Sequence, residues 1–342
     1  MNKNISSLLL AAAGAGAVIA ARTILRRVRQ LDLQGKTVLV TGGSRGLGLL
    51  LARKLLAEGA NVAICARDAA ELSRAIVELD NHRDLFAVRC DVTDREEVER
   101  MIRMVDDHFG QIDVLINNAG VIQVGPVENM THDDFREAMN IHFWGPLNTT
   151  LAVMPAMKRR GEGRIVNISS IGGKVAVPHL LPYCASKFAL VGLSEGLRAE
   201  LAKDGIIVTT VCPGLMRTGS HVNAFMKGDH RAEFTWFSIA DSLPIISMAA
   251  DRAADQIVAA LKDGRAELIL TGPAKALARV HGLHSGAIAD VLGVVNMLLP
   301  APTADPDTRW TGAESESDLS PSFLTESIDQ AMIENNERAV AS

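Results

Sequence analysis

The sequence contains few aromatic residues and few cysteines. Only 4% of the 342 residues are aromatic, and the single tyrosine is Tyr183. The four cysteines (Cys65, Cys90, Cys184 and Cys212) lie far apart, and neither they nor the nine histidines show Cys-x-x-Cys or His-Glu-x-x-His spacing. We therefore predict no metal site and interpret the cysteines as reduced residues of the core.

The chain also has no excess of basic residues. Its formal net charge is −5, which argues against nucleic acid as a partner. The charge is uneven, because residues 1–30 carry five basic residues and no acid, whereas residues 301–342 carry nine acids and two arginines. We find no internal repeat.

An uncharged stretch occupies residues 4–21 and is rich in Ala, Gly and Leu. As a helix it would be about 27 Å long, close to the ~30 Å thickness of the hydrocarbon layer. Three interpretations are open: a membrane anchor, a cleaved signal peptide, or a soluble docking helix. One lysine before the stretch and four arginines after it are the wrong charge order for a signal peptide. We favour residues 1–30 as an anchor with a basic flank that keeps the following domain on the cytoplasmic side of a membrane.

Strand-like and helix-like segments alternate through residues 31–274. The expected strands lie near 36–41, 60–66, 85–90, 112–117, 163–169, 206–212 and 266–271, and the helices include 95–109, 133–159 and 183–203. This alternation predicts an α/β fold, with a Rossmann-like, doubly wound parallel sheet of about seven strands and helices on both faces. Right-handed crossovers would bring the loops after the strands to the carboxyl edge of the sheet, where ligands bind.

A glycine-rich loop, Thr41-Gly42-Gly43-Ser44-Arg45-Gly46-Leu47-Gly48, follows the first strand and begins a helix that ends at Gly59. This context predicts a phosphate site at the start of the helix. Gly42 permits the tight turn, Gly46 lets the backbone approach a pyrophosphate, and Gly48 permits close packing of helix and strand.

The second strand ends at Ala66 and Arg67, where NAD-selective folds place an acidic residue. Arg67 and Arg45 beside the adenosine ribose would suit a 2′-phosphate, so we predict NADP(H) as the cofactor. The alternative is that one or both arginines are solvated, and Asp68 is a possible partner for Arg67.

Tyr183 and Lys187 are one helical turn apart, so they project from the same helix face. A nearby ammonium favours the phenolate, so we expect Lys187 to lower the pKa of Tyr183 toward the range of efficient acid–base catalysis. Ser170 could hold the substrate oxygen, and Ser169 is the fallback candidate.

Taken together, the motifs resemble those of the short-chain dehydrogenase/reductase family over about 33–272. They are the glycine loop, Asp91-Val92, Asn117-Asn118-Ala119-Gly120, Asn140, Ser170, Tyr183 with Lys187, and Pro213-Gly214 followed by Thr218. The resemblance implies four catalytic residues, Asn140, Ser170, Tyr183 and Lys187, with Asn140 at a helix distortion in a proton relay. It also implies that the cofactor is held by Thr41, Gly42, Ser44, Arg45, Gly46, Leu47, Gly48, Arg67, Asp91, Val92, Asn118, Ala119, Gly120, Tyr183, Lys187, Pro213, Gly214 and Thr218.

From these features we predict an NADP(H)-dependent oxidoreductase that interconverts a ketone and a secondary alcohol. Phe225, Phe234, Trp236 and Phe237 lie in residues 215–250, which cover the substrate in such folds, so we expect a lipophilic substrate such as a lipid, steroid or retinoid. The alternative is that these aromatics pack into the core or against a partner chain. Rival functions are reduction of acyl thioesters or small carbonyls, and a non-catalytic dinucleotide-binding scaffold. The family often forms homodimers or homotetramers, which here would use 133–159 and 183–203.

Residues 275–342 form the predicted C-terminal extension. The mostly apolar residues 275–300 suggest helices that lie on a membrane surface or on a partner subunit. The acidic remainder reads as a flexible or loosely ordered tail, with a last helix possible from Ser320 through Ala331.

Overall fold

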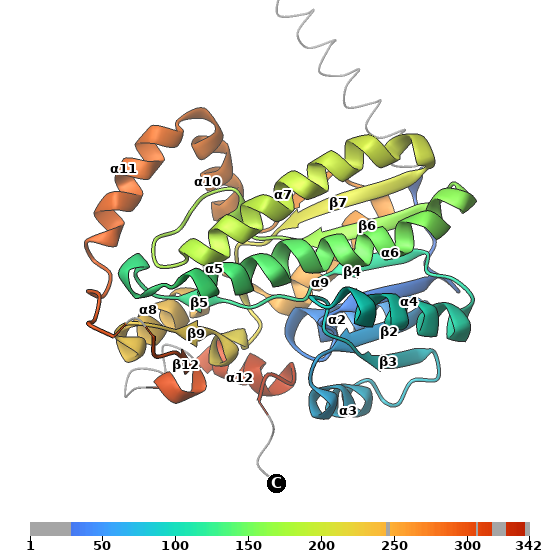
Figure 1. The fold of residues 1–342 in the computed structure, drawn as a ribbon, viewed down its shortest axis with the longest axis horizontal. Coiled ribbons are helices and arrows are strands. Elements are labelled where there is room, and N and C mark those ends of the chain that lie inside the picture. Colours follow the sequence, from blue (N-terminus) through green and yellow to red (C-terminus); the bar gives the residue numbers. More distant parts are fainter. Residues whose placement is uncertain (1–28, 244–246, 306, 317–325, 339–342) are drawn as a thin grey trace, which may run out of the picture.

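The computed structural model describes residues 29–243, 247–305, 307–316 and 326–338, and its centre is a seven-stranded parallel sheet (Figure 1). The strand order is β11-β7-β6-β4-β1-β2-β3. The strands are laid down outward from β1 in one direction as far as β3, and from β4 onward in the opposite direction, so the topological switch lies between β1 and β4. The strands are β1 (Thr37–Thr41), β2 (Asn61–Ala66), β3 (Leu85–Arg89), β4 (Val114–Asn117), β6 (Gly163–Ile168), β7 (Ile206–Cys212) and β11 (Glu267–Ile269). The predicted doubly wound parallel sheet is therefore confirmed.

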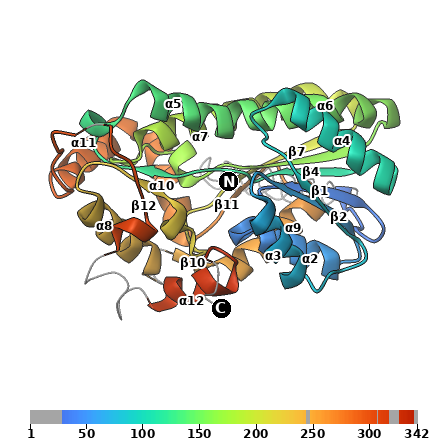
Figure 2. The same ribbon diagram turned by 60° about the horizontal axis from the view of Figure 1, so that its bottom comes forward.

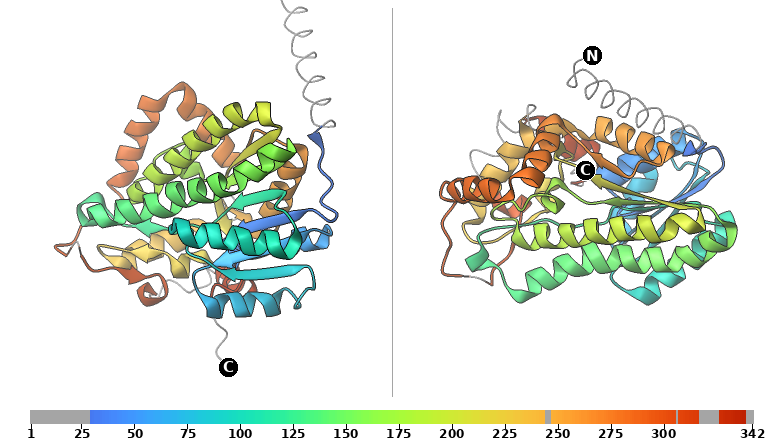
Figure 3. Two further views of the ribbon diagram at one scale, coloured as in Figure 1. Left: turned by 45° about the vertical axis from the view of Figure 1, so that its right-hand side comes forward. Right: turned by 90° about the horizontal axis from the view of Figure 1, so that it is seen from above.

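Helices cover both faces of this sheet (Figures 2 and 3). Helices α2 (Gly46–Ala57), α3 (Ala69–Glu78) and α9 (Ala250–Asp263) bury Leu49, Ala75 and Ile257 against one face. Helices α4 (Arg95–Phe109), α6 (Gly145–Arg160) and α7 (Leu181–Leu201) bury Met101, Met157 and Leu201 against the other. The four cysteines are buried and free, as the sequence predicts for core residues.

The segment predicted as one helix over 133–159 consists of three pieces. Helix α5 (His132–Met139) starts with a capping box formed by Thr131 and Asp134. A π-helical turn, η2 (Asn140–Trp144), follows and continues into α6. The expected distortion at Asn140 is therefore present, and π-bulges of this kind often occur at functional sites.

A second, smaller core lies beyond the carboxyl edge of the sheet. It is formed by β5 (Gln123–Val124), β9 (Phe225–Met226) and α8 (His230–Ser242), and β12 (Trp310–Thr311) pairs with β9. The paired strands β8 (Leu215–Arg217) and β10 (Ser247–Ala249) instead pack against the main core through Met216 and Met248. Phe234 and Phe237 of α8 are buried in the second core with Val124, Ala224 and Met226. These two aromatics thus follow the alternative interpretation and pack into a core, because α8 turns their face toward β5 and β9.

The C-terminal extension begins with a helical hairpin, α10 (Gly272–Leu283) and α11 (Ser285–Asn296), at the margin of the molecule (Figure 1). It exposes large apolar side chains, among them Leu283, Met297 and Leu298. Helix α12 (Glu326–Glu334) follows later and packs against α8. The short helices are η1 (Val127–Asn129), η3 (Ile171–Gly173), η4 (Ala202–Asp204), η5 (Ser220–Asn223) and η6 (Ala313–Ser315).

The expected membrane anchor, residues 4–21, lies outside the described residues and stays a prediction. Among the helices that are described, none combines the length and the apolar character needed to cross a bilayer. The expected subunit interface also stays a prediction. Its helices and π-turn do expose Trp144, Leu151, Leu181 and Phe188.

Candidate active site

Ser170 and Tyr183 face each other at the carboxyl edge of the sheet. Ser170 follows β6, and its hydroxyl accepts a hydrogen bond from Gly172 N at 3.0 Å. Tyr183 lies in the first turn of α7 and forms a side-chain hydrogen bond with Ser170. The two hydroxyls are therefore placed to hold one substrate oxygen between them.

Ser169 points in a different direction. Its hydroxyl donates to the carbonyl oxygen of Lys187 at 3.0 Å, and its side chain is buried. This contact ties α7 to the end of β6, and the choice of Ser170 over Ser169 stays a prediction.

Lys187 lies one turn after Tyr183 in α7, with its Nζ 5.6 Å from the centre of the Tyr183 ring. Its Nζ donates a hydrogen bond to the carbonyl oxygen of Ile168 at 3.0 Å. Burial lowers the pKa of Lys187 to about 7, because a low-dielectric surrounding disfavours the ammonium.

The pKa of Tyr183 departs from the sequence-based expectation. Burial raises it well above its ordinary value, although the hydrogen bond from Ser170 acts in the opposite direction. The expectation that Lys187 lowers this pKa is wrong for this arrangement of the protein. The physical reason is that burial desolvates the phenolate, and the same effect makes Lys187 itself tend to lose its proton.

His142 is a site residue that sequence reasoning missed. It belongs to the π-turn, and its ring packs edge-on against Tyr183 with centroids 5.4 Å apart. Its Nε2 accepts from Val121 N at 3.1 Å, so its Nδ1 carries the proton and donates to Ser186 Oγ at 2.8 Å. Burial, followed by Lys187, lowers the pKa of His142 well below its ordinary value. His142 is thus a neutral side chain that packs against Tyr183 and holds its ring in place. No sequence motif marks this histidine.

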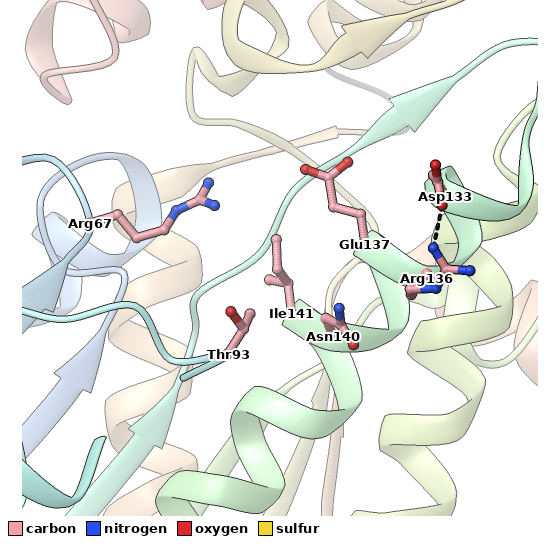
Figure 4. A pocket seen from close by; sticks show the side chains of 7 residues that line it. All are labelled: Arg67, Thr93, Asp133, Arg136, Glu137, Asn140 and Ile141. Carbon is pink, nitrogen blue, oxygen red and sulfur yellow. Dashed lines mark hydrogen bonds and ion pairs between the residues drawn. The ribbon is translucent and has the colours of Figure 1, made fainter. Parts of the chain in front are cut away.

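Asn140 lies beside a cavity of about 240 Å³ at the edge of the sheet (Figure 4). The lining residues are Arg67, Thr93, Asp133, Arg136, Glu137, Asn140 and Ile141. Arg67 reaches the cavity from the side opposite to the helix that carries Asn140 (Figure 4). The proton relay through Asn140 stays a prediction.

The glycine loop has a backbone conformation that its glycines permit. Gly42 and Gly46 have positive φ angles of 63° and 55°, which L-residues with side chains rarely adopt. A Cβ atom on Gly48 would come within 2.6 Å of Asn118 Nδ2 and would overlap the Gly42 carbonyl. Because these glycines carry no side chains, the backbone at the start of α2 can approach a phosphate closely, which fits a dinucleotide.

Thr41 and Asn118 hold this loop in place. Asn118 Nδ2 donates to the carbonyl oxygens of Thr41 and Gly42 at 3.1 and 3.0 Å. The Thr41 hydroxyl accepts from Asn118 N and Ala119 N at 3.0 and 3.1 Å. Leu47 is buried below the loop, and Gly120 lies against the His142 ring. These predicted cofactor residues thus support the loop from within the protein.

The predicted adenosine end holds Ser44, Arg45, Arg67, Asp91 and Val92. Arg45 lies 3.4 Å from Glu71, and Arg67 lies 4.0 Å from Asp91. Asp91 Oδ1 also accepts from Thr93 N at 2.9 Å, and the Val92 carbonyl accepts from Asn148 at 3.2 Å. Asp68, the suggested partner of Arg67, caps helix α3.

The predicted nicotinamide end follows β7. The Pro213 carbonyl accepts from Ile171 N at 2.6 Å, which ties this loop to the Ser170 turn. Gly214 lies against Thr271, and the buried Thr218 donates to Ser220 Oγ at 2.8 Å. The structure therefore brings both ends of the predicted cofactor site to the same edge of the sheet as Ser170, Tyr183 and Lys187.

A model of the short chain dehydrogenase family matches residues 36–227. The chain belongs to this family. A dehydrogenase/reductase SDR family protein 7-like of Anopheles gambiae is 36% identical over 227 residues, which cover 64% of this chain and 72% of that protein. A putative ketoacyl reductase of Streptomyces coelicolor is 39% identical over 186 residues, covering 54% of this chain and 71% of that protein.

Solved structures show the same fold. A single-site variant of actinorhodin polyketide ketoreductase with NADPH has a TM-score of 0.62 and 32% identity, over 69% of this chain and 96% of that one. A 3-ketoacyl-(acyl-carrier-protein) reductase from Brucella melitensis with NADH has a TM-score of 0.63 and 25% identity, over 70% and 98%. This chain is therefore a short-chain dehydrogenase/reductase, a family of oxidoreductases that bind a nicotinamide dinucleotide.

Proposed function

We propose that the protein reduces a ketone to a secondary alcohol with NADPH, or catalyses the reverse reaction. The observation that carries this proposal is the arrangement of Ser170, Tyr183 and Lys187 at the carboxyl edge of the sheet, beside the glycine loop at the start of α2. A dinucleotide-binding scaffold would need the loop, but it would have no use for the three polar side chains.

Ser170, Tyr183 and Lys187 each have a separate role in this reaction. A nicotinamide cofactor, when bound, would supply the hydride. Ser170 and Tyr183 hydrogen-bond the carbonyl oxygen and stabilise the negative charge that develops on it. Tyr183 then donates its proton to that oxygen. Lys187, once protonated, favours the resulting phenolate and draws a new proton toward the site.

We propose NADP(H) over NAD(H) because Arg45 and Arg67 border the adenosine end of the site. A guanidinium recognises a 2′-phosphate through charge-assisted hydrogen bonds. Of the solved relatives, one contains NADPH and another contains NADH, so they favour neither cofactor. The preference for a 2′-phosphate therefore rests on the two arginines.

Replacing both arginines by alanine (Arg45→Ala with Arg67→Ala) should weaken NADPH binding by roughly 10²- to 10⁴-fold and change NADH binding much less, since each of the two lost charged contacts contributes about 1.5–3 kcal/mol. Fluorescence titration of both cofactors gives the ratio. Arg53→Ala, on the exposed side of α2, serves as the control. A double variant with an unchanged NADPH-to-NADH ratio would show that the arginines do not read the phosphate.

We propose a lipophilic substrate, while the likeness to ketoacyl reductases favours an acyl thioester as the second candidate. Phe234 and Phe237 are buried in the second core and do not support a lipophilic substrate. Phe225, Trp236 and Leu180 are only half-buried in this region, and they are the apolar side chains that support it.

A panel of steroid, retinoid, small and long-chain ketones and 3-ketoacyl thioesters separates these possibilities. We expect NADPH consumption by the chain lacking residues 1–30 to rise with the apolar length of the ketone. Equal efficiency across chain lengths would remove the lipophilic proposal. Preference for thioesters over ketones of matched length would favour the second candidate.

A further inference from the structure

Three residues near the C-terminal end of the described chain lie inside the predicted cofactor site. Asn335, Asn336 and Glu337 follow α12, and each is buried, with only 5–7% of its surface exposed. The sequence suggested a loosely ordered tail here, because this region is acidic and carries few apolar residues. In the structure Ile328, Ala331 and Met332 are buried and anchor α12, and the three polar residues that follow contact the glycine loop.

These three residues contact the glycine loop at groups that a dinucleotide would use. Gly46 N, at the start of α2, donates to the carbonyl oxygen of Asn335 at 2.8 Å. Asn336 Nδ2 donates to the Ser44 carbonyl at 2.7 Å. The Glu337 carboxylate lies 3.5 Å from Arg45 Nε, and one of its oxygens occupies the space where a Gly46 side chain would stand.

The same residues also contact the opposite side of the site. Asn335 Nδ2 donates to the Thr218 carbonyl at 3.0 Å. Asn223 Nδ2 donates to the carbonyl oxygen and to Oε2 of Glu337 at 2.9 and 2.8 Å. On the adenosine side, Arg74 Nε of α3 donates to Asn336 Oδ1 at 2.9 Å. The segment therefore bridges the adenosine and nicotinamide ends of the predicted site.

We propose that Asn335–Glu337 is an internal competitor of the cofactor, which must leave the glycine loop before NADP(H) can bind. The inference rests on the proposed function, because it assumes that the dinucleotide binds at this loop. A carboxylate beside Arg45 and a carbonyl oxygen on the first amide of α2 take the positions that suit phosphate oxygens. Only the fraction of molecules with a released segment is competent to bind, so the apparent dissociation constant is raised by the inverse of that fraction.

The competition should depend on pH through Glu337. Burial raises the pKa of Glu337 in the docked segment to about 7, while Arg45 and the hydrogen bond from Asn223 oppose this rise and the carboxylate of Glu71 adds to it. A released, solvated glutamate has a pKa near ~4.3. Docking therefore takes up a proton, so it is favoured at low pH and weakens as the pH rises toward about 7.

The test compares NADPH titrations of the full chain with those of a chain that ends at Glu334. A second variant, Asn336→Ala with Glu337→Ala, keeps the full length, and Glu334→Gln is the matched control because Glu334 is exposed. Thermal melts verify that each variant is folded. We expect the truncated and doubly substituted proteins to bind NADPH about tenfold more tightly than the full chain and the control.

The outcomes separate the two proposals. Equal affinities in all four proteins would overturn the internal competitor and leave the proposed function intact. Weaker binding after truncation would also overturn it, since the segment would then be a strap over the bound cofactor. Absence of NADPH binding in every protein would overturn the proposed function, and the inference with it.

Two further readouts are specific to the mechanism. The affinity ratio between truncated and full chains should fall by up to tenfold per pH unit between pH ~5 and ~7, and Glu337→Gln should remove this dependence. Saturation with NADPH should also speed amide hydrogen exchange at residues 335–337, which are protected in the docked state. Slower exchange on NADPH addition would contradict the proposal.

Discussion

Tyr183→Phe should lower kcat/KM for any ketone substrate by about 10³-fold, within the 10²–10⁴-fold range of a general acid, and leave NADPH binding nearly unchanged. Phenylalanine keeps the ring that packs against His142, so the fold and the loop geometry are retained. It removes the hydroxyl that is placed both to donate a proton and to share the substrate oxygen with Ser170.

The measurement is steady-state NADPH consumption, with a cofactor titration on the same samples. Phe188→Leu is a suitable control, because Phe188 lies on the same helix and its side chain is exposed. A Tyr183→Phe protein with turnover near that of the unmodified chain would exclude Tyr183 as the proton donor. It would leave the dinucleotide site itself unaffected.

Lys187→Met should strongly lower activity and at the same time stabilise the cofactor-free protein. Activity should fall by at least about 10²-fold, because the substitution removes the ammonium that stabilises the phenolate and brings a new proton to the site. Stability should rise because burial holds the pKa of Lys187 at about 7, so the folded protein bears the cost of a desolvated amine. Since one pKa unit corresponds to roughly 1.4 kcal/mol, we expect a gain in the free energy of unfolding of at least about 1 kcal/mol at neutral pH.

The pH dependence of this gain has a definite sign. Between about pH 7 and the ordinary lysine value of 10.5, the unfolded chain binds more protons at this side chain than the folded one. The stability contributed by Lys187 therefore rises with pH, and the advantage of the methionine variant shrinks toward zero near pH 10.5. Urea unfolding at several pH values measures it.

Lys203→Met, at an exposed position, should show no such trend. A Lys187→Met protein that is less stable than the unmodified chain at pH 7 would contradict the argument. That result would mean that the hydrogen bond to the Ile168 carbonyl outweighs the cost of burying the amine.

The order of strands and the positions of the site motifs follow from local sequence. Thr37–Thr41 and Ile206–Cys212 are recognisable as buried parallel strands because both faces are covered and their residues are mostly apolar and β-branched. The glycine loop follows from backbone conformation, since Gly42 and Gly46 require positive φ angles. The spacing of Tyr183 and Lys187 places them on one helix face by helical periodicity alone.

Tertiary structure decided what periodicity and spacing do not encode. Whether Phe234 faces a substrate or a second core depends on how α8 lies against β5 and β9. The pKa of Tyr183 depends on burial by segments distant in sequence, and these reversed the effect expected from its neighbour Lys187. The placement of Glu337 beside Arg45, far away along the chain, arises from the docking of α12. The sequence by itself determined the fold, the glycine loop and the chemistry of the site, because these depend on local backbone geometry and residue type. Access to the site was decided only by long-range packing, because burial and charge pairing depend on which segments the fold brings together.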